Sequence, residues 1–307
     1  MRFFCLAVML TVIATASVAP SHARADTTSC AGRLAGVVSK VDPAGTSITV
    51  TLPSPLNDKV LVIADSKATA PVAHAQPGDL ISFDADDTAN STRLTCLGAI
   101  KRQTPVIPRL LVLAFSLALI CGIAAVMTWG SPLEFMVGAD NRYSNSQTQL
   151  ALWFTAVAAV YLAAVLLRWC YLGADYIGGV GITENVMALT GLSALSFGGA
   201  KVITTQKIRN ATQPNQPAPK PPAAQPHLLT DLVQNDSGQA DLGDFEMILV
   251  TLAAVGIFAV SAFHFLGALA LDTSVMLPDV DSTLLASFGI GHGAYLVKKA
   301  ALKLGDG

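Results

Sequence analysis

The sequence predicts an α+β membrane protein, in which a small exported β barrel or sandwich domain is followed by five transmembrane helices. Composition predicts the membrane part: 52% of the 307 residues are hydrophobic and 13% are charged, whereas soluble domains average about 25% charged residues. The order of segments predicts the rest, because short alternating runs come first and long apolar runs follow. The net charge of −2 gives no basic excess of the kind that nucleic-acid binding requires.

Residues 1–25 have the features of a signal peptide. Arg2 supplies a positive start, residues 6–18 form an apolar stretch that is short for a membrane span, and Ala23-Arg24-Ala25 offers a cleavage site. We therefore expect residues 26–100 to be exported. An uncleaved anchor is the alternative.

The cysteines fit an exported domain followed by a membrane part. Cys30 and Cys96 stand near the two ends of the exported segment and are a candidate disulfide, because export leads to an oxidising compartment. Cys121 and Cys170 fall in apolar segments, where we expect them to be packing residues.

Residues 31–100 contain short strand-like runs separated by turns, which predicts the small barrel or sandwich. Their rhythm resembles that of the five-stranded barrels of the OB type. OB surfaces that bind nucleic acid use several aromatic residues and a basic groove. This segment has one aromatic residue, Phe83, so no nucleic-acid partner is predicted. The expected strands are residues 37–41, 47–51, 60–63, 80–83 and 94–100, with turns at 42–45 and 77–79.

Five apolar segments follow, and about 20 residues of helix are enough to cross a bilayer. The third segment is shorter and rich in Gly, Ala and Ser, and the fifth continues as a helix through Lys298 and Lys299. Lys and Arg gather where the third and fifth segments end, so the positive-inside rule places the C-terminus in the cytoplasm and the β domain in the periplasm. The expected location is a bacterial inner membrane. The segments are residues 110–129, 150–172, 186–203, 247–271 and 283–297, with a stiff linker at 101–109 and a Pro-rich cytoplasmic linker at 204–230.

The membrane part contains a weak internal repeat. A lead-in and hairpin at residues 131–203 correspond to a second set at residues 231–304. Two unrelated hairpins are the alternative, because helices rich in Ala, Gly and Leu align easily. A duplication would relate the copies by an axis along the membrane normal and would place a site between them. The aligned residues are Glu134 with Asp231, Gln149 with Glu246 and Lys201 with Lys299, and the expected helix caps are Ser144, in a capping box with Gln147, and Asp241.

Several motifs of this repeat resemble a group of uncharacterised bacterial inner-membrane proteins. The resemblance covers about the C-terminal half of the chain. It implies a family and a membrane location, and it brings no known activity. The motifs are Arg142-Tyr143-Ser144 with Gln149-Leu150 and Trp153, then Asp231-Leu232-Val233, Leu277-Pro278, Gly289-Ile290 and Gly293-Ala294-Tyr295-Leu296.

Two histidines form a candidate intramembrane polar site. His264 and His292 are expected at similar depth in the fourth and fifth segments, where proton relay is chemically feasible. The alternative is a neutral histidine bonded to a neighbouring backbone or hydroxyl group. A metal site would need more ligands than these segments offer, so neither a metal nor a cofactor is predicted.

Small residues in the third and fifth segments predict close helix packing. They are Ala194, Gly198, Gly289 and Gly293. Packing inside the bundle is the first interpretation, and the seam of a homo-oligomer is the alternative. Arg168 is expected to extend its side chain to the membrane surface.

The chain has no nucleophile–base set, nucleotide loop or metal cluster in its sequence, so we expect no catalysis. The predicted function is that of an inner-membrane anchored binding, sensing or scaffold protein. Its expected partners are the lipid bilayer and an extracytoplasmic protein bound by the β domain. The alternative is a small channel or transporter built from the paired hairpins, with His264 and His292 lining a cavity.

Overall fold

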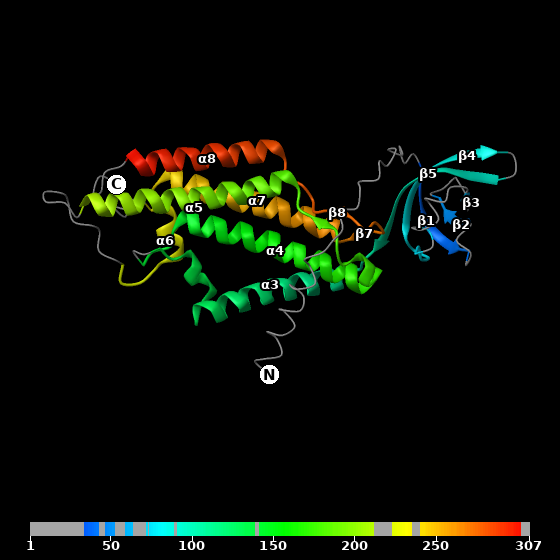
Figure 1. Ribbon diagram of the computed structural model, residues 1–307, viewed down its shortest axis with the longest axis horizontal. Helices are drawn as coiled ribbons and strands as arrows, with labels where there is room; N and C mark the ends of the chain where they lie inside the picture. Colours follow the sequence, from blue (N-terminus) through cyan, green and yellow to red (C-terminus); the bar gives the residue numbers. More distant parts are fainter. Residues whose placement is uncertain are drawn as a thin grey trace. The chain divides into compact units, whose positions relative to one another are not determined.

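The computed structural model describes residues 34–42, 47–52, 59–63, 72, 74–88, 91–138, 141–211, 223–234 and 240–301. The predicted signal peptide lies outside these residues. The chain divides into two compact units, one of Met1–Arg102 with Ala270–Thr273 and one of Gln103–Leu269 with Ser274–Gly307. The first unit holds a sheet and the second holds the long helices (Figure 1). The predicted α+β fold, with its sheet on the N-terminal side, is confirmed.

Five strands of the first unit pair in a closed ring. β1 pairs antiparallel with β2 and β4, β2 pairs with β3, β4 pairs with β5, and the parallel pair β3–β5 completes the ring. Inward-facing residues alternate along the strands, as in a small barrel, and they include Val38, Ile48, Val50, Ile81 and Phe83. The strands are β1 (Leu34–Val41), β2 (Ser47–Thr51), β3 (Lys59–Ile63), β4 (Leu80–Thr88) and β5 (Ser91–Gln103), so each predicted strand segment is confirmed.

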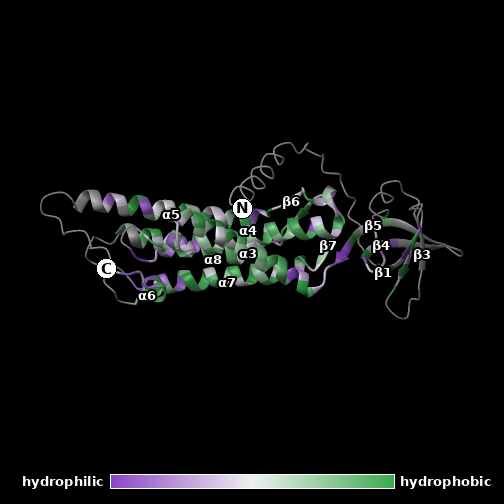
Figure 2. Cartoon of the chain, turned by 90° about the horizontal axis from the view of Figure 1, so that it is seen from below, coloured by the Kyte–Doolittle hydropathy of each residue, from purple (hydrophilic) through white to green (hydrophobic). Residues whose placement is uncertain are grey.

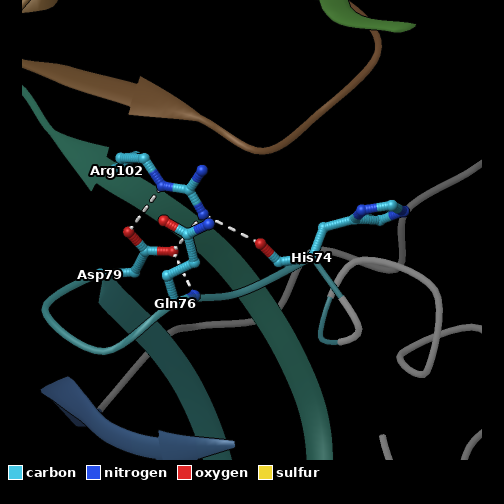
Figure 3. Close-up of polar contacts among 4 residues, drawn as sticks. All are labelled: His74, Gln76, Asp79 and Arg102. Carbon is cyan, nitrogen blue, oxygen red and sulfur yellow. Dashed lines mark hydrogen bonds and ion pairs between the residues drawn. The ribbon is translucent and has the colours of Figure 1, made fainter. Parts of the chain in front are cut away.

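A buried ion pair fastens the turn before β4 to the end of β5 (Figure 3). Arg102 donates from Nε to Asp79 Oδ1 and from Nη2 to Asp79 Oδ2, both at 3.0 Å. Arg102 Nη2 also donates to the His74 carbonyl at 2.9 Å, and the Gln76 N–H donates to Asp79 Oδ2 at 2.8 Å. Asp79 is 2% exposed. These bonds compensate the cost of burying the charges, because the carboxylate is met by a two-pronged guanidinium and a backbone donor.

The second unit is a helical bundle. In the described part of the chain, four helices are long and apolar enough to cross a membrane: α3, α4, α5 as far as Ile203, and α7. Figure 2 shows hydrophobic residues predominating along α3 and α7. The elements that follow β5 in the chain are α3 (Val106–Thr128), η1 (Pro132–Met136), α4 (Asn145–Leu172), η2 (Ala174–Tyr176), β6 (Val180–Gly181), α5 (Glu184–Ala211), α6 (Leu228–Val233), α7 (Leu242–Phe265), β7 (Ala268–Ala270), β8 (Val275–Met276) and α8 (Ser282–Ala301).

The predicted fifth span lies in α8, which is a helix of 20 residues but is not one of the four apolar helices. Its glycines, His292 and two lysines near its end lower its hydropathy. The count of five spans therefore stays a prediction.

Three helix boundaries differ from the predicted segments. β5 runs to Gln103 and α3 begins at Val106, so the predicted stiff linker at 101–109 is wrong. Proline suits a helix start because the first N–H groups of a helix have no partner within it. α5 continues to Ala211, so the first part of the predicted cytoplasmic linker is helical. α7 ends at Phe265 instead of Leu271.

Four of the helices pack in a ring around an apolar core. α4 packs against α5 and α7, and α8 packs against the same two helices. α3 packs against α4. The core of the ring includes Trp153, Leu167, Leu189, Phe258 and Phe288.

The two lead-ins have the same backbone pattern. The Ser144 N–H donates to the Met136 carbonyl at 2.8 Å, and the Asp241 N–H donates to the Val233 carbonyl at 2.8 Å. Each short helix, η1 or α6, is followed by an isolated antiparallel bridge and then by a long helix. The bridges are Val137–Tyr143 and Gln234–Ala240. The two hydrogen bonds and the two bridges are separated along the sequence by the same number of residues as Glu134 and Asp231, which the predicted repeat aligns.

The helix caps after these lead-ins differ. Asp241 accepts hydrogen bonds from the N–H groups of Gly243 and Asp244 at 2.9 and 3.2 Å, as predicted for a cap. Ser144 occupies the cap position of α4 but makes no side-chain cap bond. Its hydroxyl lies 3.3 Å from that of Ser146, so the predicted capping box with Gln147 is wrong.

The second helices of the two hairpins, α5 and α8, run parallel and in register. Ser196 hydrogen-bonds to His292. A Cβ added at Gly199 would meet Leu296 Cδ2 at 3.2 Å, and one added at Gly289 would meet Leu192 Cδ1 at 3.8 Å. β6 and β8, which precede these helices, also pair in parallel. Corresponding parts of the two hairpins therefore contact each other.

Candidate functional site

Among the described residues, nine polar side chains are buried on the four helices of the ring, and we call five of them the polar layer. Each of these five is at most 4% exposed. Each lies on the helix face that carries the apolar core: Gln149 is one turn before Trp153, and His292 is one turn after Phe288. The five residues are Gln149 in α4, Ser193 and Ser196 in α5, Thr251 in α7 and His292 in α8.

One side-chain hydrogen bond connects α4 to α5 and shows which of their residues lie at the same depth. Trp153 Nε1 donates to the Thr190 hydroxyl oxygen at 2.8 Å. The two helices run in opposite directions (Figure 1). Because a helix rises about 1.5 Å per residue, Gln149 lies about 6 Å from Trp153, and Ser193 and Ser196 lie about 5 to 9 Å beyond Thr190 in the same direction. Gln149 and the two serines are therefore at similar depth.

Direct contacts bring the other two helices to this depth. His292 Nδ1 hydrogen-bonds to the Ser196 hydroxyl, which joins α8 to α5. The Trp153 and Phe258 rings lie 5.5 Å apart, which joins α7 to α4. Thr251 precedes Phe258 by two turns on the same buried face. The polar layer thus draws residues from all four helices.

Aromatic rings cover one side of the polar layer. Trp153, Phe258 and Phe288 are fully or almost fully buried. The Phe288 ring lies 4.2 Å from the His292 ring, centroid to centroid. Beyond these rings the ring of helices is filled by apolar side chains, so the polar layer ends abruptly there.

Three polar atoms of the layer have no hydrogen-bond partner within the described part of the chain: Gln149 Nε2, Gln149 Oε1 and His292 Nε2. In the first turn of α4, Asn145 Oδ1 and Thr148 Oγ1 lack partners as well. A buried polar group without a partner costs about 1–3 kcal/mol. These atoms gather at the start of α4, with one more on α8, and each of them calls for an explanation.

The hydroxyl groups of the layer are satisfied locally. Ser193 donates to the Leu189 carbonyl at 3.0 Å, and Thr251 donates to the Met247 carbonyl at 2.8 Å. Each bond runs to the preceding turn of the same helix. Their oxygens keep acceptor capacity, because a hydroxyl has two lone pairs.

His264 does not belong to the polar layer. It lies exposed in the last turn of α7, where its ring meets Phe263 edge-on at 6.4 Å. His292 lies well inside α8. The predicted common depth of the two histidines is wrong, because α7 ends at Phe265 and the chain then turns. The structure does not bring them together.

Arg168 is buried at 1% exposed and does not extend to the surface, so that prediction is wrong. Its Nε donates to the Tyr176 carbonyl at 2.9 Å, and its guanidinium carbon lies 5.8 Å from the Tyr176 ring centroid. Tyr176 and Val180 are also buried. The segment after α4 therefore packs against the bundle, and Arg168 holds it where it leads into α5.

Of the residues predicted for helix packing, only Gly289 lies at the contact of α5 with α8. Ala194, Gly198 and Gly293 are exposed, and a Cβ added at either glycine would meet nothing within 4 Å. In the described residues the close approach is made at Gly199 instead. For the three exposed residues, the seam of a homo-oligomer stays a prediction.

Cys96 on β5 is disulfide-bonded, and its predicted partner Cys30 lies outside the described residues, so the pairing stays a prediction. Cys121 and Cys170 are free thiols. Among the described residues no three His, Cys, Asp or Glu side chains come together in a way that could hold a metal ion.

Sequence reasoning singled out His292 but missed its neighbours. Gln149 was aligned as part of a lead-in, and Trp153 was named as part of a family motif. A usable signal was present, because Ser193 and Ser196 share a helix face and Gln149 stands one turn before a tryptophan. No family model, curated protein or solved structure matches the chain.

Proposed function

We propose that this chain is a non-enzymatic protein of the bacterial inner membrane that displays a binding or sensing barrel outside the membrane. The observation that carries the proposal is the division of the chain into a barrel with its own core and a helical unit with four helices able to cross a bilayer. Large apolar side chains such as Leu111, Phe115 and Val126 are exposed along α3, which suits contact with lipid.

The barrel supports a binding role through its connectivity. A three-stranded meander, followed by β4 beside β1 and a parallel pair β3–β5, is the strand order of OB-type barrels. Such barrels bind ligands on an exposed face and its flanking loops. A periplasmic barrel and a cytoplasmic C-terminus follow from the signal-like N-terminus and the distribution of Lys and Arg.

The helical unit is proposed to be a duplicated hairpin. One support is that the backbone N–H groups of Ser144 and Asp241 make the same hydrogen bond at equivalent positions of the two lead-ins. The other is that α5 and α8 contact each other in register. Parallel packing of corresponding helices fits an axis along the membrane normal.

A small channel or transporter is the second candidate function. The polar layer favours it, because unpartnered polar groups enclosed by membrane-spanning helices mark solute or ion pathways. On this reading the barrel would be an accessory domain, and the site would lie in the helical unit.

Cysteine labelling of the full chain in cells tests the proposed topology. In a background with Cys121→Ser and Cys170→Ser, Val37→Cys on β1 and Thr205→Cys near the end of α5 supply exposed positions. A membrane-impermeant maleimide should label Val37→Cys in intact spheroplasts and Thr205→Cys only after permeabilisation. Equal labelling of both in intact spheroplasts would contradict the orientation.

Two further readouts separate the candidate functions. A photo-crosslinker at Val37 that captures one defined extracytoplasmic protein, with no solute flux through purified protein in liposomes, supports the anchored binding protein. Flux that is lost on His292→Leu, with no crosslinked partner, supports the channel or transporter.

A further inference from the structure

We propose that the polar layer binds a small uncharged molecule that both donates and accepts hydrogen bonds, of the amide type. The inference deepens the second candidate function, since it names the class of solute. Its central observation is that Gln149 is 0% exposed and neither its Nε2 nor its Oε1 has a partner among the described residues.

The hydrogen-bonding capacity of the layer matches an amide. The Gln149 carboxamide offers one donor group and one acceptor side by side, which pair with the oxygen and N–H of another amide. His292 Nε2 lies on a different helix at the same depth and is also unpartnered. Since Nδ1 of this ring bonds to the Ser196 hydroxyl, His292 is oriented with Nε2 pointing away from that bond.

The absence of charge in the layer selects an uncharged ligand. Its five residues are an amide, three hydroxyl residues and an imidazole. Moving an ion out of water into such an enclosure costs several kcal/mol unless a counter-charge meets it. The layer offers dipoles and no counter-charge, so neutral solutes are favoured over cations and anions.

Buried polar side chains continue from the layer into the first turn of α4. Asn145 Oδ1 and Thr148 Oγ1 are unpartnered there, on the side of the layer away from the aromatic rings. Helical side chains lean toward the N-terminus of their helix, so the Gln149 amide extends toward this turn. Polar groups thus continue from the start of α4 to the layer, while Trp153, Phe258 and Phe288 close the other side.

Trp153 is a built-in reporter for this site. It is 0% exposed, whereas Trp129 and Trp169 are 96% and 55% exposed. Replacing the two exposed tryptophans by Phe leaves Trp153 as the single tryptophan of the full chain in detergent micelles, where it is excited selectively over the tyrosines. Acrylamide is an uncharged amide that quenches tryptophan, and iodide and caesium are charged quenchers of the same emission.

We expect acrylamide to quench Trp153 while iodide and caesium do not, and we expect acetamide to compete with acrylamide. Gln149→Leu should weaken the competition by acetamide about tenfold, because two hydrogen bonds are lost. His292→Leu should weaken it as well. Glu246→Leu is the matched control, since Glu246 is aligned with Gln149 in the second hairpin but is exposed.

The proposal is overturned if Trp153 resists acrylamide, if ions quench it equally, or if Gln149→Leu behaves as the control does. Should Gln149→Leu fail to fold by circular dichroism, Gln149→Asn keeps the amide but shortens it, and it must also weaken competition. Retained competition without flux in liposomes would reject the transport candidate and keep the site. Flux without competition would reject this inference alone.

Discussion

The indole Nε1 of Trp153 donates a 2.8 Å hydrogen bond to the hydroxyl of Thr190, and this bond fixes how far α5 extends beside α4. Trp153 lies near the start of α4, while Thr190 is in the second turn of α5. The later half of α4 therefore packs against the returning segment around Tyr176 instead of against α5. The same bond sets the depth of the polar layer.

Trp153→Phe should destabilise the helical unit by about 1 kcal/mol through loss of this bond, because a Phe ring fills most of the volume. Thr190→Val leaves the indole N–H unpaired and should cost at least as much. The measurement is a double-mutant cycle on unfolding in detergent. A coupling energy indistinguishable from zero would show that the bond does not hold the two helices in register.

The Arg102–Asp79 pair should be among the most sensitive positions of the barrel. Asp79→Ala removes the carboxylate that pairs with the largely buried guanidinium and should cost about 3 kcal/mol. Arg102→Lys should be damaging too, since an ammonium cannot reproduce both 3.0 Å bonds. Thermal unfolding of the strand signal by circular dichroism measures these losses. The double substitution Asp79→Leu with Arg102→Met should destabilise the barrel less than Asp79→Ala does. An equal or larger loss of stability would contradict the assignment of a buried ion pair.

The two lead-ins give a matched pair of cap substitutions. Asp241→Ala should cost about 1 kcal/mol, because Asp241 caps two N–H groups of α7. Ser144→Ala should leave hydrogen exchange at the start of α4 unchanged, because the Ser144 side chain makes no cap bond and its hydroxyl contacts Ser146 instead. Hydrogen exchange of the first turns of α7 and α4 reports each effect. Equal losses in both helices would contradict the difference between the caps.

Asp281 caps α8 and should make its first turn sensitive to acid. The Thr283 hydroxyl and N–H bond to the carboxylate and hold the pKa of Asp281 below its ordinary value. A carboxyl whose pKa is lowered in the folded state stabilises above its unfolded pKa, and this contribution disappears as the pH falls through the folded pKa. An NMR titration of the carboxyl carbon and the Thr283 amide should show both changing together. Asp281→Asn should abolish the pH dependence of the amide, and a Thr283 amide that titrates unchanged in this variant would refute the assignment.

The barrel strands were predictable because the alternation of buried and exposed residues marks each strand locally, as in Ser47–Thr51. The closure of the five strands into a ring was not predictable, because the parallel pairing of β3 with β5 depends on residues far apart in the chain. The Arg102–Asp79 pair was missed for the same reason. A turn signal identifies Asp79 but gives no information about a partner on another strand.

The apolar helices were predictable from hydropathy, but the ends of two were not. Apolar residues continue past Phe265 because Leu266, Leu269 and Leu271 are buried in non-helical segments. A run of apolar residues indicates that a segment is buried, but it does not show whether the segment is a helix or a packed loop. This is why His264 was placed too deep, whereas His292, in a helix with a well-defined start, was placed inside its helix.

The register of α5 against α8 tests the duplicated hairpin most directly. With Cys121 and Cys170 replaced by Ser, paired cysteines are introduced at Leu192 with Gly289 and at Gly199 with Leu296, and disulfide formation is followed in native membranes. Both pairs should crosslink rapidly, while Leu192 with Leu285, one turn out of register, should not. Efficient crosslinking of the shifted pair, with neither in-register pair reacting, would contradict the account.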